Sequence, residues 1–539
     1  MSFNARLSSL RLRPRHANLL SRCDGWKAQR RGLNEFITRV PEPTGPQDLP
    51  STFRLAVKDN IATLSTPTTC ASDILAGYTS PFEATVVSQL RARGASVVGK
   101  TNLDEFGMGS HSTNSAAGPV RHTPPDLAPF SVGGSSGGSA VAISEGAADL
   151  ALGTDTGGSV RLPAAYCGVV GFKPSYGMIS RFGVVPYANS LDTVGFLAQT
   201  VRPIWEQVAA RGGLWSEHDP RDPTSLSAPA RKRCAAARQF YDREDLPGAD
   251  QFQQTLRSLT FGIPIEYNIA ELDAPTRTAW ARAASRLEAL GARVVPVSLP
   301  STRHALSAYY VIAPAEASSN LAKYDGVRYG RRAGDASTSD GAGGVLYAGT
   351  RGEGFGAEVR RRVLLGSYTL SSEAMGNYFI RAQRVRRLVA RDFDRAFRLA
   401  NPLRGSSSSS SSGEGPEEGQ EQEQEQFDLS EMDEGVALES KLGPPQVDFL
   451  LCPTAPTAPP RLDEVMGQGS PLDSYMNDVF TVPASLAGLP AVSIPVRLDG
   501  GAGAGEGEKK VGGLQLVAQY WDDARLLAVA HGLFEDPEV

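Results

Sequence analysis

The segment GTDTGGSVRLPAAYCGVVGFKPSYG, from Gly153 to Gly177, carries the strongest structural signal in the chain. It follows a short apolar run, Leu150–Leu152, that is typical of a buried strand, and it opens as a glycine-rich loop ending at Ser159. Glycines directly before a serine expose successive backbone N–H groups, which can form an oxyanion hole around a tetrahedral intermediate on that serine. A second apolar run, Val169–Phe172, follows, so the segment predicts two strands joined through a reactive loop.

Two upstream segments add groups that suit nucleophilic catalysis. The sequence GGSSGGS at residues 133–139 lets the backbone approach a ligand closely, and its Ser135 precedes Ser159 by 24 residues. Lys58 follows the strand-like run Phe53–Val57, where loss of hydration lowers the pKa of a lysine and makes it a base near neutral pH. A serine hydroxyl needs a proton acceptor to become a good nucleophile, and Ser135 can relay the proton to neutral Lys58.

Helices and strands alternate around these loops. Thr85–Arg93 reads as an amphipathic helix and Ser96–Val98 as the strand after it. This alternation predicts an α/β fold with a mostly parallel or mixed sheet covered on both faces. Further along, Ala357–Arg398 reads as one long helical stretch, and Ala491–Val496 with Leu514–Val517 as a hairpin.

The pieces AVKDN, GGSSGGSA and the long segment quoted first resemble the amidase signature family in their order and spacing. The resemblance implies the amidase signature fold, a large mixed sheet with helices on both faces. It implies Ser159 as the nucleophile, Ser135 as a bridging serine at a cis peptide bond, and Lys58 as the base. It also implies an oxyanion hole made by the backbone N–H groups of Thr156, Gly157, Gly158 and Ser159. Asp155 and Arg161 are interpreted as a structural ion pair that braces the loop.

Later segments resemble one branch of that family, the glutaminase subunits of tRNA-dependent amidotransferases. They are residues 309–313, 316–321, 324–330, 354–366 and 475–483. The resemblance implies glutamine as the substrate, a zwitterion that needs both a cation and an anion. It assigns Arg362 to the α-carboxylate, Asp478 to the α-ammonium and Tyr309 to the pocket wall, with Tyr310 as the alternative.

The same resemblance implies partners. A second chain of the amidotransferase, the B-subunit, would activate Glu-tRNA(Gln) with ATP and Mg²⁺ and would bind most of the tRNA, and a small third subunit is expected. No cofactor is expected in this chain. The six histidines are isolated and form no metal-binding motif, so no metal is expected either.

The composition indicates where in the cell the protein is located and which partners it can bind. The 539 residues carry a net charge of −5, which becomes +6 without the eleven acidic residues of 405–440, too weak a charge to argue RNA binding by this chain. Residues 1–31 hold eight basic side chains, seven of them arginine, against one acid, which is typical of a mitochondrial transit peptide. Five scattered cysteines favour a reducing compartment, and no apolar run reaches the eighteen residues of a membrane span. We expect a location in the mitochondrial matrix without integral membrane contact.

Three segments have compositions that favour surface insertions. Residues 330–344 are rich in Gly, Ser and Asp, residues 405–440 combine seven consecutive serines with a Glu/Gln repeat, and residues 500–513 are rich in glycine. Such segments hold too few apolar side chains to form a core. We therefore expect a single amidase domain over residues 32–539 with disordered insertions at these places.

Three other interpretations remain at this point. The chain could be an amidase of the same family acting on another small amide, through an apolar pocket. The pattern G-x-S-x-G around Ser135 could mark an α/β-hydrolase, which needs one of His218, His304 or His531 as a base. A scaffold protein without activity is the third, although Lys58 and both serines are intact.

Overall fold

The computed structural model describes residues 32–41, 52–122, 129–238, 240–241, 243–333, 346–403, 446–467, 471–498 and 510–534. The predicted transit segment and most of the three predicted insertions lie outside these residues. The described residues from Asn34 onward belong to one compact unit. Within the described residues, no helix is both long and apolar enough to cross a bilayer.

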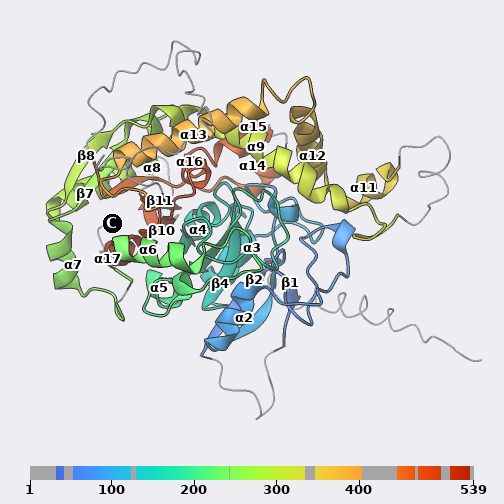
Figure 1. The fold of residues 1–539 in the computed structure, drawn as a ribbon, viewed down its shortest axis with the longest axis horizontal. Helices are drawn as coiled ribbons and strands as arrows, with labels where there is room; N and C mark the ends of the chain where they lie inside the picture. The colour runs from blue at the N-terminus through green and yellow to red at the C-terminus, as the bar shows by residue number, and fades with distance from the viewer. Residues whose placement is uncertain are drawn as a thin grey trace, which may run out of the picture. The chain divides into compact units, whose positions relative to one another are not determined.

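A single mixed sheet organises this unit. Its described strands are β1 (Phe36–Arg39), β2 (Phe53–Lys58), β3 (Ala95–Thr101), β4 (Leu150–Asp155), β5 (Val170–Lys173), β6 (Thr193–Ala198), β7 (Thr260–Pro264), β8 (Arg293–Val297), β9 (Phe449–Pro453), β10 (Ala491–Leu498) and β11 (Lys510–Ala518). Their order across the sheet is β1-β3-β2-β4-β6-β5-β10-β11-β9-β7-β8, and Figure 1 shows the sheet passing from β8 at one end to β1 at the other. The pairs near each end are mainly parallel, whereas the strands from β4 to β9 pair antiparallel.

Every residue of the central strands β4 and β6 is buried, although their side chains point alternately to the two faces of the sheet. Both faces of the sheet are therefore covered, and the covering elements are helices. The described helices are α2 (Thr85–Ala92), α3 (Gly137–Ser144), α4 (Arg161–Cys167), α5 (Val201–Val208), α6 (Ala228–Arg238), α7 (Ala249–Leu256), α8 (Ala274–Ala289), α9 (Ala305–Asn320), α11 (Ala348–Gly354), α12 (Ala357–Thr369), α13 (Phe379–Ala396), α14 (Leu462–Met466), α15 (Pro471–Met476), α16 (Val482–Leu486) and α17 (Asp523–Phe534). The predicted α/β class and mixed sheet are confirmed. Apolar runs predicted the strands well because buried strands need them on both faces.

Two element boundaries differ from the prediction. The long helical stretch is two helices, α12 and α13, separated by residues 370–378, where serine, glycine and asparagine interrupt the helical pattern. The predicted hairpin is confirmed as β10 and β11, but residues 510–513 belong to the strand and not to the insertion. Gly513 is there because α4 packs on it: a Cβ at Gly513 would lie 2.4 Å from the Cβ of Ala165.

Candidate active site

Lys58 ends strand β2 in the middle of the core and is completely buried. Its Nζ donates to the Oγ atoms of Ser135 and Ser136, 2.8 Å from each, and to the carbonyl oxygen of Thr154 at 3.3 Å. Burial lowers the pKa of the Lys58 ammonium to about 7, although Asp104 and other buried carboxylates oppose that shift. A substantial neutral fraction therefore exists near neutral pH, as a general base requires.

The glycine-rich loop before α3 brings Ser135 to that lysine. The peptide bond between Gly134 and Ser135 is cis. Only glycine fits at Gly134, because a Cβ there would lie 2.2 Å from a carboxylate oxygen of Asp104. The backbone N–H of Ser136 donates to the carbonyl oxygen of Ser159 at 3.1 Å. This bond joins the two serine loops that the sequence placed 24 residues apart.

The loop between β4 and α4 holds the predicted nucleophile and the predicted oxyanion donors. Ser159 keeps 8% of its surface exposed, whereas Ser135 is fully buried. Within the described residues, the backbone N–H groups of Gly157, Gly158 and Ser159 have no acceptor. Thr156 is held through its side chain, which donates to Asp192 at 2.7 Å. Adjacent unpaired N–H donors beside a serine hydroxyl can bind an oxyanion.

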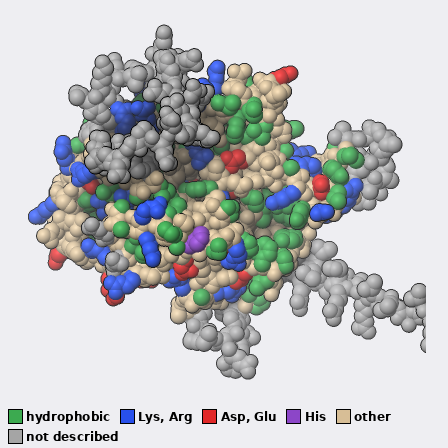
Figure 2. Space-filling model, in the orientation of Figure 1, with side chains coloured by type: hydrophobic (Ala, Val, Ile, Leu, Met, Phe, Trp, Pro, Cys, Tyr) green, Lys and Arg blue, Asp and Glu red, His purple; other side chains and the backbone are tan. Residues whose placement is uncertain are grey.

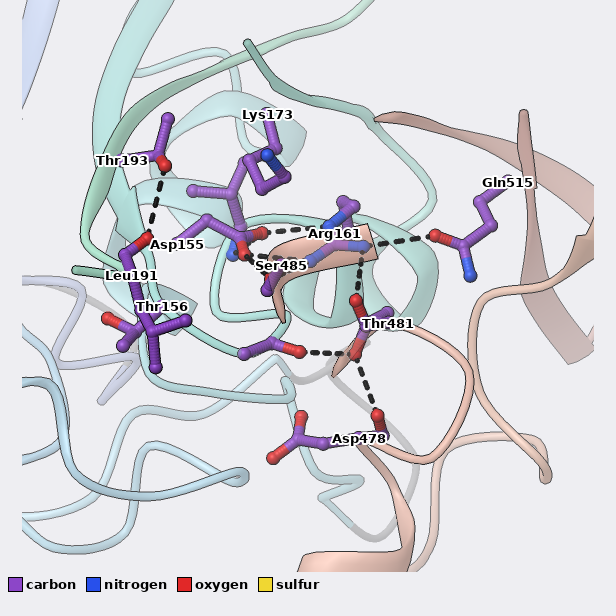
Figure 3. A network of polar contacts seen from close by, with 12 residues as sticks. Asp155, Thr156, Arg161, Lys173, Leu191, Thr193, Asp478, Thr481, Ser485 and Gln515 are labelled. Atoms are coloured by element: carbon purple, nitrogen blue, oxygen red, sulfur yellow. Dashed lines mark hydrogen bonds and ion pairs between the residues drawn. The ribbon is translucent and has the colours of Figure 1, made fainter. Parts of the chain in front are cut away.

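Arg161, at the start of α4, fixes the end of this loop (Figure 3). Its guanidinium donates to the Asp155 carboxylate at 2.8 and 3.0 Å, to the carbonyl oxygen of Thr481 at 2.9 Å and to Gln515 at 3.2 Å. Burial alone would raise the pKa of Asp155, but Arg161 outweighs it and holds that pKa below its usual value. The side chain of Thr481 donates to the carbonyl oxygen of Gly157 at 2.6 Å. The predicted ion pair between Asp155 and Arg161 is confirmed, and it holds the loop between β4 and α4 in place.

Arg362 projects from α12 into a cluster of aromatic rings. Its Nε donates to Glu358 at 2.7 Å and its Nη1 to the Oη of Tyr187 at 2.7 Å. The rings of Tyr310 and Tyr475 each lie with their centroids 5.4 Å from the guanidinium carbon. In the described part of the chain, Nη2 of Arg362 has no acceptor. A buried cation with an unpaired N–H edge suits a carboxylate.

Asp478 offers the opposite charge close to the nucleophile loop. Its Oδ2 accepts hydrogen bonds from Ser110 at 3.0 Å and from Tyr310 at 3.3 Å. Burial raises the pKa of Asp478 to about 7, although Ser110 and Arg362 oppose that shift. A Cβ on Gly158 would lie 3.2 Å from the Oδ1 of Asp478, so this carboxylate borders the predicted oxyanion hole.

Tyr309 and Tyr310, neighbours on α9, lie against different parts of the site. A Cβ on Gly157 would lie 2.7 Å from the ring of Tyr309, so Tyr309 packs directly on the oxyanion loop. Tyr310 instead contacts Asp478 and stacks on Tyr475, with 4.1 Å between ring centroids. Tyr309 therefore contacts the oxyanion loop, and Tyr310 contacts the charged residue Asp478.

Sequence reasoning missed several residues that complete this arrangement: Ser136, Ser110, Tyr187, Glu358 and Tyr475. Glu358 had a usable signal, because residues four apart on a helix lie on one face and Glu358 precedes Arg362 by four. Tyr187 lies in an irregular loop between β5 and β6, where no periodicity marks it.

The histidines required by an α/β-hydrolase do not serve Ser135. The Oγ of Ser135 bonds Lys58, and no histidine of the described residues bonds it. His218 instead lies 3.4 Å from the Oγ of Ser225. The described residues also contain no cluster of three or more potential metal ligands.

The family model described as Amidase matches residues 54–403 and 419–527. The chain belongs to the amidase family. The predicted family membership is therefore confirmed, and the lysine and serine loops of the site lie inside the matched region.

Curated relatives of this amidase family member cover almost its whole length. The mitochondrial A-subunit of glutamyl-tRNA(Gln) amidotransferase from Podospora anserina is 61% identical over 94% of this chain and 96% of its own. The protein of the same name from Neurospora crassa is 60% identical over 93% of each chain. The crystal structure of the glutamyl-tRNA(Gln) amidotransferase A-subunit from Thermotoga maritima has a TM-score of 0.62 and 33% identity, over 90% of this chain and 83% of that one. This likeness supports the predicted amidase signature fold.

Proposed function

We propose that this member of the amidase family is the glutaminase subunit of a mitochondrial glutamyl-tRNA(Gln) amidotransferase. The observation that carries the proposal is the contact between Lys58, a base with a pKa of about 7, and Ser135, beside the donor loop of Ser159. Arg362 and Asp478 supply the two opposite charges that a free amino acid needs. The relatives at about 60% identity that bear this name support the same assignment.

The charged pair orients the substrate. The α-carboxylate of glutamine binds the free edge of Arg362, and its α-ammonium binds Asp478. Tyr309 packs against the substrate where it meets the oxyanion loop. With its α-carboxylate on Arg362 and its α-ammonium on Asp478, glutamine directs its side-chain amide toward Ser159. The binding energy of the two charged contacts thus orients the amide for attack.

The chemistry proceeds by acyl transfer. The Oγ of Ser159 attacks the amide carbon while its proton passes to Ser135 and the proton of Ser135 passes to neutral Lys58. The N–H groups of Thr156, Gly157, Gly158 and Ser159 stabilise the oxyanion. The C–N bond then breaks, the nitrogen takes a proton from the relay and leaves as ammonia, and a glutamyl ester remains on Ser159. Water cleaves that ester through the same relay, which releases glutamate.

The ammonia serves a partner. The B-subunit uses ATP and Mg²⁺ to activate Glu-tRNA(Gln), binds most of the tRNA and converts it to Gln-tRNA(Gln), and a small third subunit completes the complex. This chain itself needs no cofactor. The relatives' names and the arginine-rich composition of residues 1–31 support the mitochondrial matrix as the location.

Separating the ammonia source from its use tests this function. In the complex, the Ser159→Ala variant should lose glutamine hydrolysis and glutamine-dependent amidation, while amidation driven by added ammonium chloride persists. Loss of ammonium-driven amidation in an assembled complex would contradict this division of labour. Faster turnover of an aliphatic amide than of glutamine by the unmodified protein would instead favour an amidase acting on another small amide.

A further inference from the structure

The helical hairpin formed by α12, residues 370–378 and the start of α13 exposes an apolar surface. Six large side chains within seventeen residues are between 42% and 71% exposed: Leu364, Leu365, Tyr368, Met375, Tyr378 and Ile380. Figure 2 shows hydrophobic side chains gathered over this part of the molecule, near the top of the view. We call this set the hairpin patch. Monomeric proteins rarely expose so many large apolar side chains side by side unless another molecule covers them.

The packing of α12 explains why its apolar side chains face outward. Gly366 lies so close to α9 that a Cβ there would be 1.9 Å from the carbonyl oxygen of Pro314. This contact fixes the inner face of α12, which also carries Arg362. Leu364 and Tyr368 are therefore held on the outer face, and Tyr368 meets Tyr378 across the hairpin with 6.0 Å between ring centroids. The hairpin patch therefore combines side chains of α12, of the connecting residues 370–378 and of the first turn of α13.

The charges around the hairpin patch select its occupant. Arg360 and Arg381 are exposed beside it, as is Arg361, which also pairs with Glu358. Glu373 is the one exposed acid between residues 357 and 384, all of which the structure describes. A second copy of this chain would meet the patch through a two-fold axis and would oppose these arginines to one another. A different protein with an apolar centre and an acidic rim fits the surface without that repulsion.

We propose that the hairpin patch docks the partner protein that consumes the ammonia, a proposal that rests on the function proposed above. The outer face of α12 is separated from Arg362 only by the thickness of one helix, about 10 Å. A protein seated there lies next to the glutamine site, as transfer of a small, freely diffusing product requires. Exposed side chains of this number provide several hundred Å² of apolar contact, a large part of the ~800 Å² per partner in a standard interface.

The experiment measures the affinity of the full chain for the B-subunit from the same genome by biolayer interferometry. Leu364→Glu and Met375→Glu, tested singly and together, place charges in the patch. Ile265→Glu is the matched control, since Ile265 is an apolar side chain in another part of the fold and its exposure, 53%, lies between those of Met375 and Leu364. Thermal unfolding of each variant excludes misfolding. We expect each patch variant to weaken binding by about 30-fold or more and the control to bind unchanged.

Each other outcome has a definite meaning. Unchanged affinity in the double variant overturns the proposal, as does failure of the unmodified chain to bind the B-subunit. If the patch variants, measured without the B-subunit, differ from the unmodified chain in oligomeric state, the hairpin patch joins two copies of this chain. That result also overturns the proposal. Glutamine turnover by the unmodified complex is measured in parallel. If the patch variants lose binding while that complex hydrolyses no glutamine, the docking surface stands and the proposed glutaminase function fails.

Discussion

At the scale of single residues, burial moves Lys58 and Asp478 toward neutral pH from opposite sides. Loss of hydration disfavours the charged form of each, so the pKa of the lysine falls to about 7 and that of the aspartate rises to about 7. The proposed chemistry needs a neutral Lys58 and an ionised Asp478. Both forms gain population as pH rises through 7, so burial makes one pH interval control both substrate binding and catalysis.

The first prediction concerns Lys58. Glutamine turnover should rise with pH along a limb with an apparent pKa near 7, because neutral lysine accumulates above that value. Steady-state kcat/KM measured at pH values on both sides of 7 tests this, because kcat/KM reports the ionisations of the free enzyme. Lys58→Met should remove both the activity and the limb, and a Lys58→Met protein with unreduced kcat would show that another group is the base.

The second prediction concerns the charged pair. Arg362→Ala and Asp478→Asn should each raise the KM for glutamine about 10- to 100-fold, since each removes a charge-assisted contact of roughly 1.5–3 kcal/mol. Asp463→Asn is the control, because Asp463 pairs with Arg461 at the surface. Saturation kinetics on the three variants give the answer. An unchanged KM in either pocket variant excludes that residue from glutamine binding.

The residues of this site differ in how visible they are in the sequence. Lys58, Ser135 and Ser159 stand in dense motifs whose residue types already imply chemistry, and the fold brings Lys58 into contact with Ser135. The sequence does not mark Ser136, because nothing in the motif distinguishes it from its neighbour Ser135. Only the structure shows that Lys58 donates a hydrogen bond to Ser136 as well. Tyr187 could not be predicted, since only the tertiary structure brings it to Arg362.

At the scale of elements, the site depends on how closely α12 packs against α9. The contact exists because Gly366 has no side chain, and it sets the position of Arg362 one turn earlier on the same helix. Sequence periodicity predicted a helix here but not the contact of Gly366 with α9. A single glycine in a helical pattern indicates a less stable helix and does not show which element packs against it. The break at residues 370–378 was missed for a related reason: short polar segments do not interrupt a long helical pattern strongly.

The third prediction tests this packing. Gly366→Ala should destabilise the protein by about 1–3 kcal/mol and raise the KM for glutamine, because the new methyl group must displace backbone of α9. Gly352→Ala in α11 is the control, since a Cβ there meets nothing within 4 Å and alanine favours the helix. Urea unfolding and glutamine kinetics measure both effects. Equal stability of the two variants would mean that α12 can shift freely.

At the scale of the whole molecule, one continuous sheet brings together loops from distant parts of the sequence. Strand β2 supplies Lys58, β4 leads to Ser159, and segments after residue 300 supply the substrate-binding residues. Apolar runs in the sequence predicted the sheet, because strands that are buried on both faces consist of nearly continuous apolar residues. The order of the strands could not be read from the sequence, since β10 inserts beside β5 more than 300 residues away.

The fourth prediction concerns the acidic segment at residues 405–440, which lies outside the described residues. Replacing it with a short Gly/Ser linker should leave the melting temperature and glutamine turnover nearly unchanged, because its composition offers few apolar side chains to a core. Differential scanning calorimetry of the deletion variant tests this. A large fall in melting temperature would show that the segment packs on the body, and loss of partner binding at unchanged melting temperature would mark it as a docking segment.

The proposed mechanism requires that Ser159 forms a covalent intermediate with the glutamyl group of glutamine. Mixing the complex with glutamine, quenching rapidly with acid and mapping peptides by mass spectrometry tests it most directly. We predict one added glutamyl group, in ester linkage, on the peptide that contains Ser159, and none in the Ser159→Ala variant. A glutamyl group on Ser135 or on a cysteine, or full glutamine turnover by Ser159→Ala, would contradict this mechanism.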